Sequence, residues 1–200
     1  MPTTLTLKEQ KHRIETPDRR LTRRVNATSR LYCSLARQFA PMLLQELGDR
    51  LTSIVLYGSV ARGTARPDSD IDLFVIAGET NEEKEATWDH VWDLEYTFWN
   101  SPEVLALRRQ GYRASIETLV VSKPQALRGS PIYLDMTLEA IVLHDVEGFF
   151  PRRLDQVLQR MLELKSYREW LGRNQYVWNL KSEARPGEVF SLPYIEEAQV

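Results

Sequence analysis

The sequence predicts an α+β fold, in which a small mixed β-sheet is flanked by helices and followed by a helical C-terminal part. Short runs rich in β-branched and aromatic residues, each of strand length, occur at three or four places. Between them lie segments whose apolar residues recur at helical spacing. The strands and helices alternate without the strict regularity of repeated strand–helix–strand units, which favours a mixed sheet.

The composition is that of a globular protein with a real core. The chain has 200 residues, of which 42% are hydrophobic and 27% are charged, enough for one domain with an elaboration or for two small lobes. A formal net charge of −2 argues against electrostatic binding of nucleic acid by the molecule as a whole, and we expect no DNA partner. No apolar run approaches the roughly 20 residues that cross a membrane, so we expect no membrane segment. Cys33 is the single cysteine, which excludes a disulfide within the chain and favours a reducing, cytoplasmic setting.

Three parts are expected along the chain. Residues 1–24 form a polar, basic arm with seven Lys or Arg side chains against three acidic ones, and a solvated arm is favoured over a nucleic-acid contact. Residues 25–147 form a domain that holds the predicted sheet. Residues 148–200 hold a C-terminal helix and an irregular tail that contains two prolines and has no clear period.

The first elements of the central domain follow from the spacing of apolar residues. Residues 28–47 have apolar side chains every four residues and are followed by Gly48, which predicts a helix that ends there. Residues 51–59, LTSIVLYGS, are typical of a short buried strand, and a short helix is expected over residues 59–64. The turn sequence ARPDS precedes a second strand, DIDLFVIA, at residues 70–77.

A long amphipathic helix is predicted over residues 81–100. Near one of its faces fall Trp88, Val91, Trp92, Glu95 and Trp99. Tryptophans at helical spacing are more often part of a core or an interface than of a cofactor site. We therefore expect this face of the helix to pack into the core.

The remaining elements have clear boundary signals. Ser101-Pro102-Glu103 is typical of a helix start, with a capping serine before a proline at the first helical position. An apolar stripe predicts a long helix over residues 149–171, with Gly172 at its end. The other expected elements are a third strand at 115–122, a short helix at 132–138 and a fourth strand at 140–145.

Acidic residues stand where the second strand begins, within GSVARGTARPDSDIDLFVI at residues 58–76. Because residues i and i+2 of a strand share a face, Asp70 and Asp72 project together, while Ile71 and Leu73 face the other way. Two adjacent carboxylates repel each other and are costly to bury, and a cation between them removes that cost. Hard oxygen ligands at this spacing suit Mg²⁺, which completes its shell with water and phosphate oxygens.

Gly58 and Ser59 stand where the first strand turns into the expected short helix. Glycine lets a phosphate approach the backbone, amides at a helix start attract anions, and serine adds a hydroxyl donor. A phosphate site beside a metal site indicates phosphoryl or nucleotidyl transfer by metal-assisted in-line displacement. Glu117 interrupts the apolar third strand, and it can join Asp70 and Asp72 if that strand neighbours the second one.

These residues resemble a known family. Gly58-Ser59, ten intervening residues and Asp70-Ile71-Asp72 are similar to the GS-x10-D-x-D signature of the DNA polymerase β-like nucleotidyltransferase superfamily. The intervening residues look most like its minimal type, which is related to kanamycin nucleotidyltransferase. The resemblance is sharp over residues 54–77 and extends more loosely to Glu117. It implies a sheet of the polymerase β-like nucleotidyltransferase type in the central domain.

The resemblance implies a role for each matching residue. Asp70 and Asp72 would bind Mg²⁺, with two ions in the site, and through it the triphosphate of an NTP. Gly58 and Ser59 would contact the β- and γ-phosphates. Glu117 would complete the metal site or act as general base on an acceptor hydroxyl. The implied reaction moves NMP, most often AMP from ATP, onto that hydroxyl and releases pyrophosphate.

The acceptor and the existence of activity stay open. The acceptor could be a protein such as a HEPN-type toxin, with this chain as its antitoxin, a small molecule such as an aminoglycoside, or an RNA end held by residues 1–24. The alternative to an enzyme is a non-catalytic NTP-binding or antitoxin-like partner-binding module of the same fold. Arg62 and Arg66 could clamp phosphate, but Arg62 is expected to brace the loop through a local acid. The three histidines lack the spacing of metal ligands.

Overall fold

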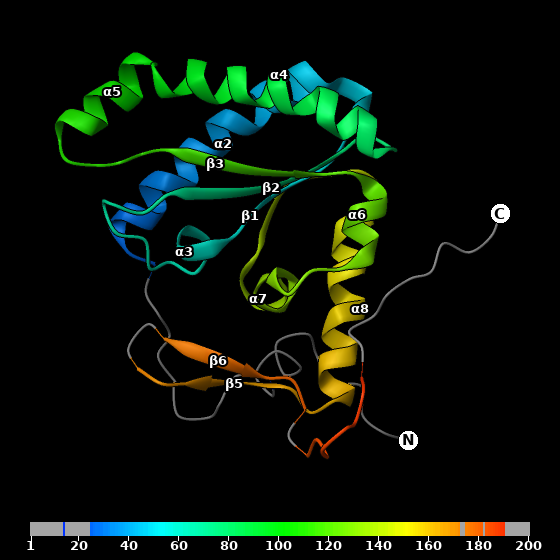
Figure 1. Cartoon of the computed structure of the whole chain (residues 1–200). Coiled ribbons are helices and arrows are strands. Elements are labelled where there is room, and N and C mark those ends of the chain that lie inside the picture. The colour runs from blue at the N-terminus through cyan, green and yellow to red at the C-terminus, as the bar shows by residue number, and fades with distance from the viewer. Residues whose placement is uncertain (1–13, 15–24, 173–174, 182, 191–200) are drawn as a thin grey trace.

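The computed structural model describes residues 14, 25–172, 175–181 and 183–190, and it confirms the predicted α+β class. Its main sheet has four strands in the order β3-β2-β1-β4 (Figure 1). The sheet is mixed, because β1 is antiparallel to both β2 and β4, whereas β2 and β3 are parallel. The strands are β1 (Leu51–Leu56), β2 (Ile71–Ala77), β3 (Ile116–Val121) and β4 (Ile141–Asp145).

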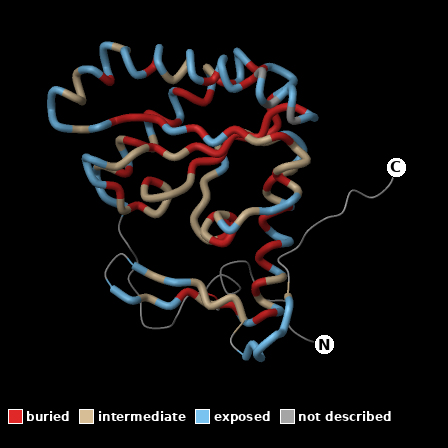
Figure 2. Tube along the Cα trace, in the orientation of Figure 1, coloured by how far each residue is buried: buried red, intermediate tan, exposed pale blue. Residues whose placement is uncertain are grey.

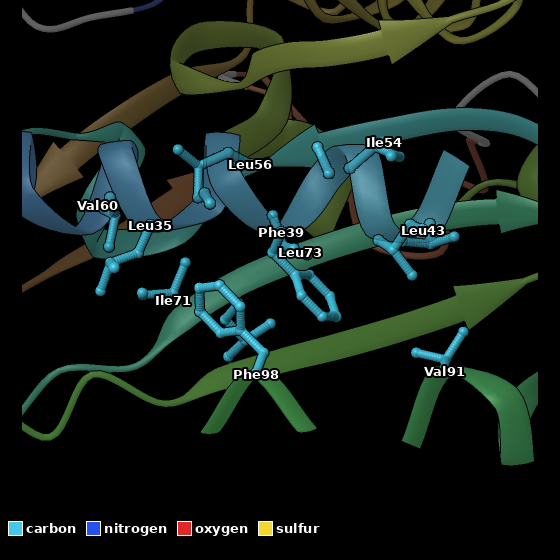
Figure 3. Packing of buried hydrophobic residues seen from close by; sticks show 14 of the residues in the cluster. Leu35, Phe39, Leu43, Ile54, Leu56, Val60, Ile71, Leu73, Val91 and Phe98 are labelled. Carbon is cyan, nitrogen blue, oxygen red and sulfur yellow. The ribbon is translucent and has the colours of Figure 1, made fainter. Parts of the chain in front are cut away.

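The helices α2 (Ala27–Leu47) and α4 (Asn81–Trp99) cover one face of the sheet (Figure 1). Figure 3 shows how their apolar side chains meet the strands, with Phe39 of α2 near Phe98 of α4. The centroids of these two rings lie 5.3 Å apart, at the edge-to-face angle that aromatic pairs favour. The apolar spacing of four in α2 thus produces the buried stripe that the sequence predicted.

The opposite face of the sheet is covered by α7 (Ile132–Glu139) and α8 (Phe149–Glu163). Phe74 of β2, Tyr133 of α7 and Phe150 of α8 form a three-ring cluster with centroids 5.1 to 5.7 Å apart. Ile14 is buried in the same hydrophobic cluster. The sheet therefore has a core on each side, and alternate residues of β2 enter one core or the other.

Shorter helices connect these layers, and most of the helix boundaries predicted from the sequence agree with the structure. Ser101 caps α5, and its hydroxyl accepts a hydrogen bond from the Val104 amide, as the sequence predicted. The helices predicted over 28–47 and 81–100 both form to within one residue of each predicted end. The short elements are η1 (Gly48–Arg50), α3 (Gly58–Ala61), α5 (Pro102–Arg109) and α6 (Lys123–Arg128), of which α6 was not predicted.

Among the described residues, no helix is both long and apolar enough to span a lipid bilayer. Residues 1–13 and 15–24, which make up most of the predicted basic arm, lie outside the described residues.

The expectation that the tryptophans of α4 enter the core is wrong. Trp88, Trp92 and Trp99 are 45%, 58% and 39% exposed, while Val91 and Phe98 are buried against the sheet. Figure 2 shows the exposed residues along the outer side of the α4 and α5 layer. At 100° per residue, the tryptophan stripe is rotated by about a quarter of a turn from the stripe that packs. The predicted face also included Val91, which the structure separates from the exposed tryptophans.

The C-terminal helix is shorter than expected. α8 ends at Glu163 rather than near Leu171, and Lys165 has a positive φ of 56°, which breaks the helical path. An antiparallel hairpin follows, made of β5 (Tyr167–Trp170) and β6 (Tyr176–Asn179). Part of the segment expected to be an irregular tail is therefore a strand.

Arg168 of β5 holds this hairpin on α7. Its side chain is 1% exposed, and its guanidinium binds the carboxylates of Glu139 and Asp135, the latter at 3.1 Å. The Tyr176 hydroxyl and the Trp178 indole N–H also donate to Asp135, at 2.8 and 2.9 Å. Because a buried cation is stable only with partners, this network explains why the chain leaves the helix and forms strands here.

We expect Asp135→Ala to lower the free energy of unfolding by about 2 to 4 kcal/mol, because it removes one carboxylate from buried Arg168 and the acceptor of two aromatic donors. Urea denaturation followed by circular dichroism measures the change. Glu163→Ala is the control, because its pair with Arg160 at 2.9 Å is on the surface and should change stability by no more than about 0.5 kcal/mol. Equal effects of the two substitutions would contradict the role of the Arg168 network.

Candidate active site

The turn after β1 packs directly against the acidic strand β2. Gly58 begins α3 with a φ of +70°, and a Cβ built on it would lie 2.1 Å from Oδ2 of Asp72. The Tyr57 amide donates to the Asp72 carbonyl at 3.0 Å, which fixes the turn to the strand. A glycine is therefore required at position 58 for two reasons, the left-handed backbone and the contact with the carboxylate.

Ser59 follows in the first turn of α3. Within the described part of the chain its hydroxyl has no hydrogen-bond partner, so the group is available to a ligand. Its carbonyl accepts the Thr64 amide at 2.9 Å, which closes the loop. Because α3 has only four residues, its dipole is small. A phosphate at this turn would therefore be bound by the turn amides and this hydroxyl.

The parallel pairing of β2 and β3 brings the third acid to the aspartates. Asp72 and Glu117 are direct partners in the ladder, so their side chains lie on the same face of the sheet. Asp70 stands one residue before β2, and its Oδ1 accepts the Ser115 hydroxyl at 2.7 Å. The structure thus places Asp72 against Gly58 and pairs it with Glu117, with Asp70 one residue before the same strand.

Burial and the neighbouring acids together raise the pKa of Asp72. Burial is the largest cause, the charges of Asp70 and Glu117 add to it, and Arg62 opposes it, with a result of about 6. Burial also raises the pKa of Tyr57 to about 12, with a contribution from the charges of Asp72 and Glu117. An acid whose pKa rises on folding makes the folded state less favourable once the pH exceeds its unfolded pKa. Ionised Asp72 therefore destabilises the fold at neutral pH, as is common for a group kept for function.

Arg113 bridges two of the acids, and the sequence analysis did not identify it. Its Nε lies 2.8 Å from Oδ1 of Asp70, and its Nη2 lies 3.4 Å from Oε1 of Glu117. Its amide donates to the Pro67 carbonyl at 2.7 Å, which ties the start of β3 to the turn before β2. An arginine four residues before Glu117 was a detectable signal, but its partner Asp70 is visible only once β2 and β3 are known to be neighbours.

Arg62 braces the loop after α3 through an ion pair, as expected. Its guanidinium lies 3.2 Å from Oε2 of Glu139 on α7. Glu139 also binds Arg168, so the hairpin, α7 and the α3 loop are joined by one chain of ion pairs. Arg66 pairs instead with Asp68 at the surface, at 3.2 Å.

Carboxylate oxygens are the donor type that a hard divalent cation prefers. Three carboxylates on adjacent strands, one of them with a raised pKa, are the conditions that favour a bound cation. Among the described residues, however, no group of three or more His, Cys, Asp or Glu side chains is arranged as a ready-made metal cluster. Arg113 draws Asp70 and Glu117 toward itself, so the metal site made of Asp70, Asp72 and Glu117 remains a prediction.

A cavity of about 410 Å³ opens between α4 and the edge strand β3. Glu117 and Arg113 line it from the strand side, and the exposed tryptophans of α4 line it from above. The Glu117 side chain alternates with those of Ile116 and Thr118, so it shares the face of Asp72 rather than the face that α4 covers.

Sequence comparisons identify the domain that holds this site. The profile of the family described as "Nucleotidyltransferase domain" matches residues 37–122, which include all five predicted site residues. A protein of Methanocaldococcus jannaschii named "Putative protein adenylyltransferase" is 55% identical over 40 residues. That match covers 20% of this chain and 27% of the relative, so it spans about a quarter of the relative's length. Residues 37–122 therefore match the nucleotidyltransferase domain family, and the resemblance to nucleotidyltransferases is confirmed.

Solved structures show only a weak likeness. A toxin–antitoxin complex with AMP-PNP is 17% identical, with a TM-score of 0.37 over 64% of this chain and 90% of that chain. A tri-AMPylated Shewanella oneidensis HEPN toxin in complex with its MNT antitoxin is 15% identical, with a TM-score of 0.32 over 65% and 90%. At such TM-scores the likeness says nothing about the activity or partners of this chain.

We expect Gly58→Ala to be more destabilising than an alanine at another glycine with positive φ. The new Cβ would displace the Asp72 carboxylate, whereas Gly111, with a φ of +89°, has nothing within 4 Å of an added Cβ. Gly111→Ala should cost about 1 kcal/mol from backbone strain alone, and Gly58→Ala at least about 1 kcal/mol more. Thermal and urea unfolding of the two variants measure the difference, and equal costs would contradict the contact with Asp72.

We expect Arg113→Gln to lower stability in EDTA, by about 0.5 to 1 kcal/mol, because it leaves Asp70 and Glu117 without their shared cation at a half-exposed site. Added Mg²⁺ should then raise the melting temperature of Arg113→Gln more than that of the unmodified protein. Arg66→Gln breaks a surface pair and should respond to Mg²⁺ as the unmodified protein does. If Mg²⁺ raised all three melting temperatures equally, Arg113 would not compete with a cation at the acids.

Proposed function

We propose that this protein is a Mg²⁺-dependent nucleotidyltransferase that moves AMP from ATP onto a hydroxyl group of a protein acceptor and releases pyrophosphate. The nucleotidyltransferase domain supports the reaction class. The short match to a relative named as a protein adenylyltransferase supports AMP as the transferred group and a protein as its acceptor.

One observation carries the proposal, namely the register between β2 and β3. It makes Asp72 the direct partner of Glu117, while Gly58 lies in contact with the other side of the Asp72 carboxylate. A triphosphate held at the turn and an acceptor hydroxyl held near Glu117 would therefore lie on opposite sides of Asp72. That is the arrangement that in-line displacement at phosphorus needs.

Each residue then has a defined task. The amides of the turn and the Ser59 hydroxyl hold the β- and γ-phosphates, and Gly58 leaves room for them. Asp70, Asp72 and Glu117 would hold Mg²⁺, which when bound supplies positive charge to the phosphate oxygens. Glu117 accepts the proton of the acceptor hydroxyl. The hydroxyl oxygen forms a bond to the α-phosphorus, the bond from that phosphorus to the β-bridging oxygen breaks, and pyrophosphate leaves.

The ion pairs around the site keep these groups in place before substrate binds. Arg113 limits the repulsion between Asp70 and Glu117, and Arg62 lowers the pKa of Asp72 from its side of the strand. Their role in this proposal is to position the carboxylates and offset their charge.

The test is transfer of label from α-labelled ATP to a protein band in cell extract. Asp70→Asn and Asp72→Asn should each reduce labelling at least about a hundredfold, and Glu117→Gln about a hundredfold to ten-thousandfold, as for loss of a general base. Asp68→Asn is the matched control, because it removes the same charge from a surface turn and should leave transfer unchanged.

Two outcomes would contradict this function. Undiminished transfer by Asp72→Asn would show that the carboxylates do not act as proposed. Tight binding of Mg²⁺ and ATP without transfer to any component of the extract would favour the alternative, a non-catalytic NTP-binding module of the same fold.

A further inference from the structure

Four large aromatic side chains project from the outer side of α4. They are 39% to 62% exposed, and we call Trp88, Trp92, Tyr96 and Trp99 the aromatic face of α4. The helix packs on the sheet through its other side, so these rings are not part of the core of the described protein (Figure 2). Patches of exposed rings are uncommon on monomeric proteins, and they mark interaction surfaces.

The aromatic face is nearly symmetric about its own centre. Its end rings, Trp88 and Trp99, are 11 residues apart, which is about 16 Å along the helix axis. Trp92 and Tyr96 lie between them at nearly equal distances from the midpoint, and all four rings fall within about 80° around the helix. A two-fold axis through that midpoint would place Trp88 of one copy against Trp99 of another, and Trp92 against Tyr96. The spacing of the rings is therefore self-complementary.

The two ends of this layer carry opposite charge. Residues 82–93 hold five acidic side chains and one lysine, whereas residues 99–109 hold two arginines and one glutamate. Figure 1 shows that α4 and α5 follow one another along the same side of the molecule, so the acidic and basic segments lie at opposite ends. Two copies in antiparallel orientation bring each acidic end against a basic end, whereas two parallel copies bring like charges together.

Asp89 and Arg108 fit the antiparallel orientation in detail. The Arg108 guanidinium lies 4.2 Å from the centroid of Trp99, and Asp89 directly follows Trp88. Neither Asp89 nor Arg108 forms an ion pair with another residue of the described chain. If Trp88 of one copy lies against Trp99 of the other, Asp89 comes level with the Arg108 guanidinium of that other copy. The two-fold axis repeats this contact, so a dimer has two such ion pairs.

We propose that the aromatic face of α4 is a dimer interface, on which a second copy of this chain packs its own α4 in antiparallel orientation. The rings of both copies form the centre of the interface, and one ion pair between Asp89 and Arg108 lies on each side of the axis. This inference concerns the assembly of the protein and does not rest on the proposed reaction.

A second copy fits this face better than a partner that carries charge of one sign. A uniformly basic or acidic partner would be attracted to one end of the face and repelled by the other. The dimer would also cover the cavity of about 410 Å³ under the rings and remove apolar surface from water. The predicted acidic site stays open, because Asp72 alternates with Ile71 and Leu73, which enter the core under α2 and α4.

The experiment is sedimentation equilibrium of the full-length protein over a hundredfold range of concentration, without nucleotide or divalent metal. We expect a reversible equilibrium between monomer and dimer, since a two-fold interface is closed. Trp92→Ala should raise the dissociation constant at least about tenfold, because each dimer loses two central rings. Leu171→Ala is the control, since it truncates an apolar side chain that is 64% exposed beside β5, and it should change the constant by less than about twofold.

Charge reversal tests the orientation of the two copies. Asp89→Arg and Arg108→Asp should each raise the dissociation constant by about three- to tenfold at low salt, because each places like charges together. The double variant exchanges the signs of the pair, and its constant should return to within about threefold of that of the unmodified protein. Asp155→Arg makes the same change of charge at an exposed position of α8 and should shift the constant by less than about twofold. Because Trp92 and Asp89 are exposed, their substitutions leave the core intact.

Three results would overturn the inference. The first is a protein that stays monomeric over the whole range, which would assign the face to a different macromolecule. The second is a dimer whose dissociation constant Trp92→Ala leaves unchanged, which would place the interface elsewhere. The third is a double variant that dissociates as readily as the single variants, which would contradict the antiparallel orientation. Absence of AMP transfer by a protein that forms the expected dimer would count against the proposed function alone.

Discussion

The structure of the site depends on electrostatic repulsion among three carboxylates that the β2–β3 register holds on one face. Asp72 cannot move away from Glu117 without breaking the ladder, and it cannot turn toward the loop because Gly58 is in contact with it. Folding therefore fixes a concentration of negative charge that an unfolded chain would disperse. The protein offsets this charge with Arg113, Arg62 and the Ser115 hydroxyl, all supplied from neighbouring segments. In the proposed reaction, a bound cation would relieve the rest of the repulsion, and this relief would add to the affinity of the site for the cation.

The C-terminal hairpin also affects the charge around Asp72, although it lies on the far side of α7. Arg168 neutralises Asp135 and shares Glu139 with Arg62. The position of Arg62, and with it the charge that lowers the pKa of Asp72, therefore depends on the hairpin being in place. Burial raises the pKa of Glu139, and both arginines oppose that rise. The segment outside the matched family domain thus helps to hold the loop that carries Gly58 and Ser59.

The positions that the sequence predicted follow from local rules. Strand alternation placed Asp70 with Asp72, and the end of the first strand placed Gly58 at a turn into a short helix. Arg113 and Arg168 were not found, because each acquires its role from acids that are distant in sequence. The hairpin was mistaken for the end of a helix because its apolar residues continue the helical spacing past Glu163, and only the partners of Arg168 decide between helix and strand. The tryptophan face shows the same limit, since periodicity reveals which side chains share a face but not which face is covered.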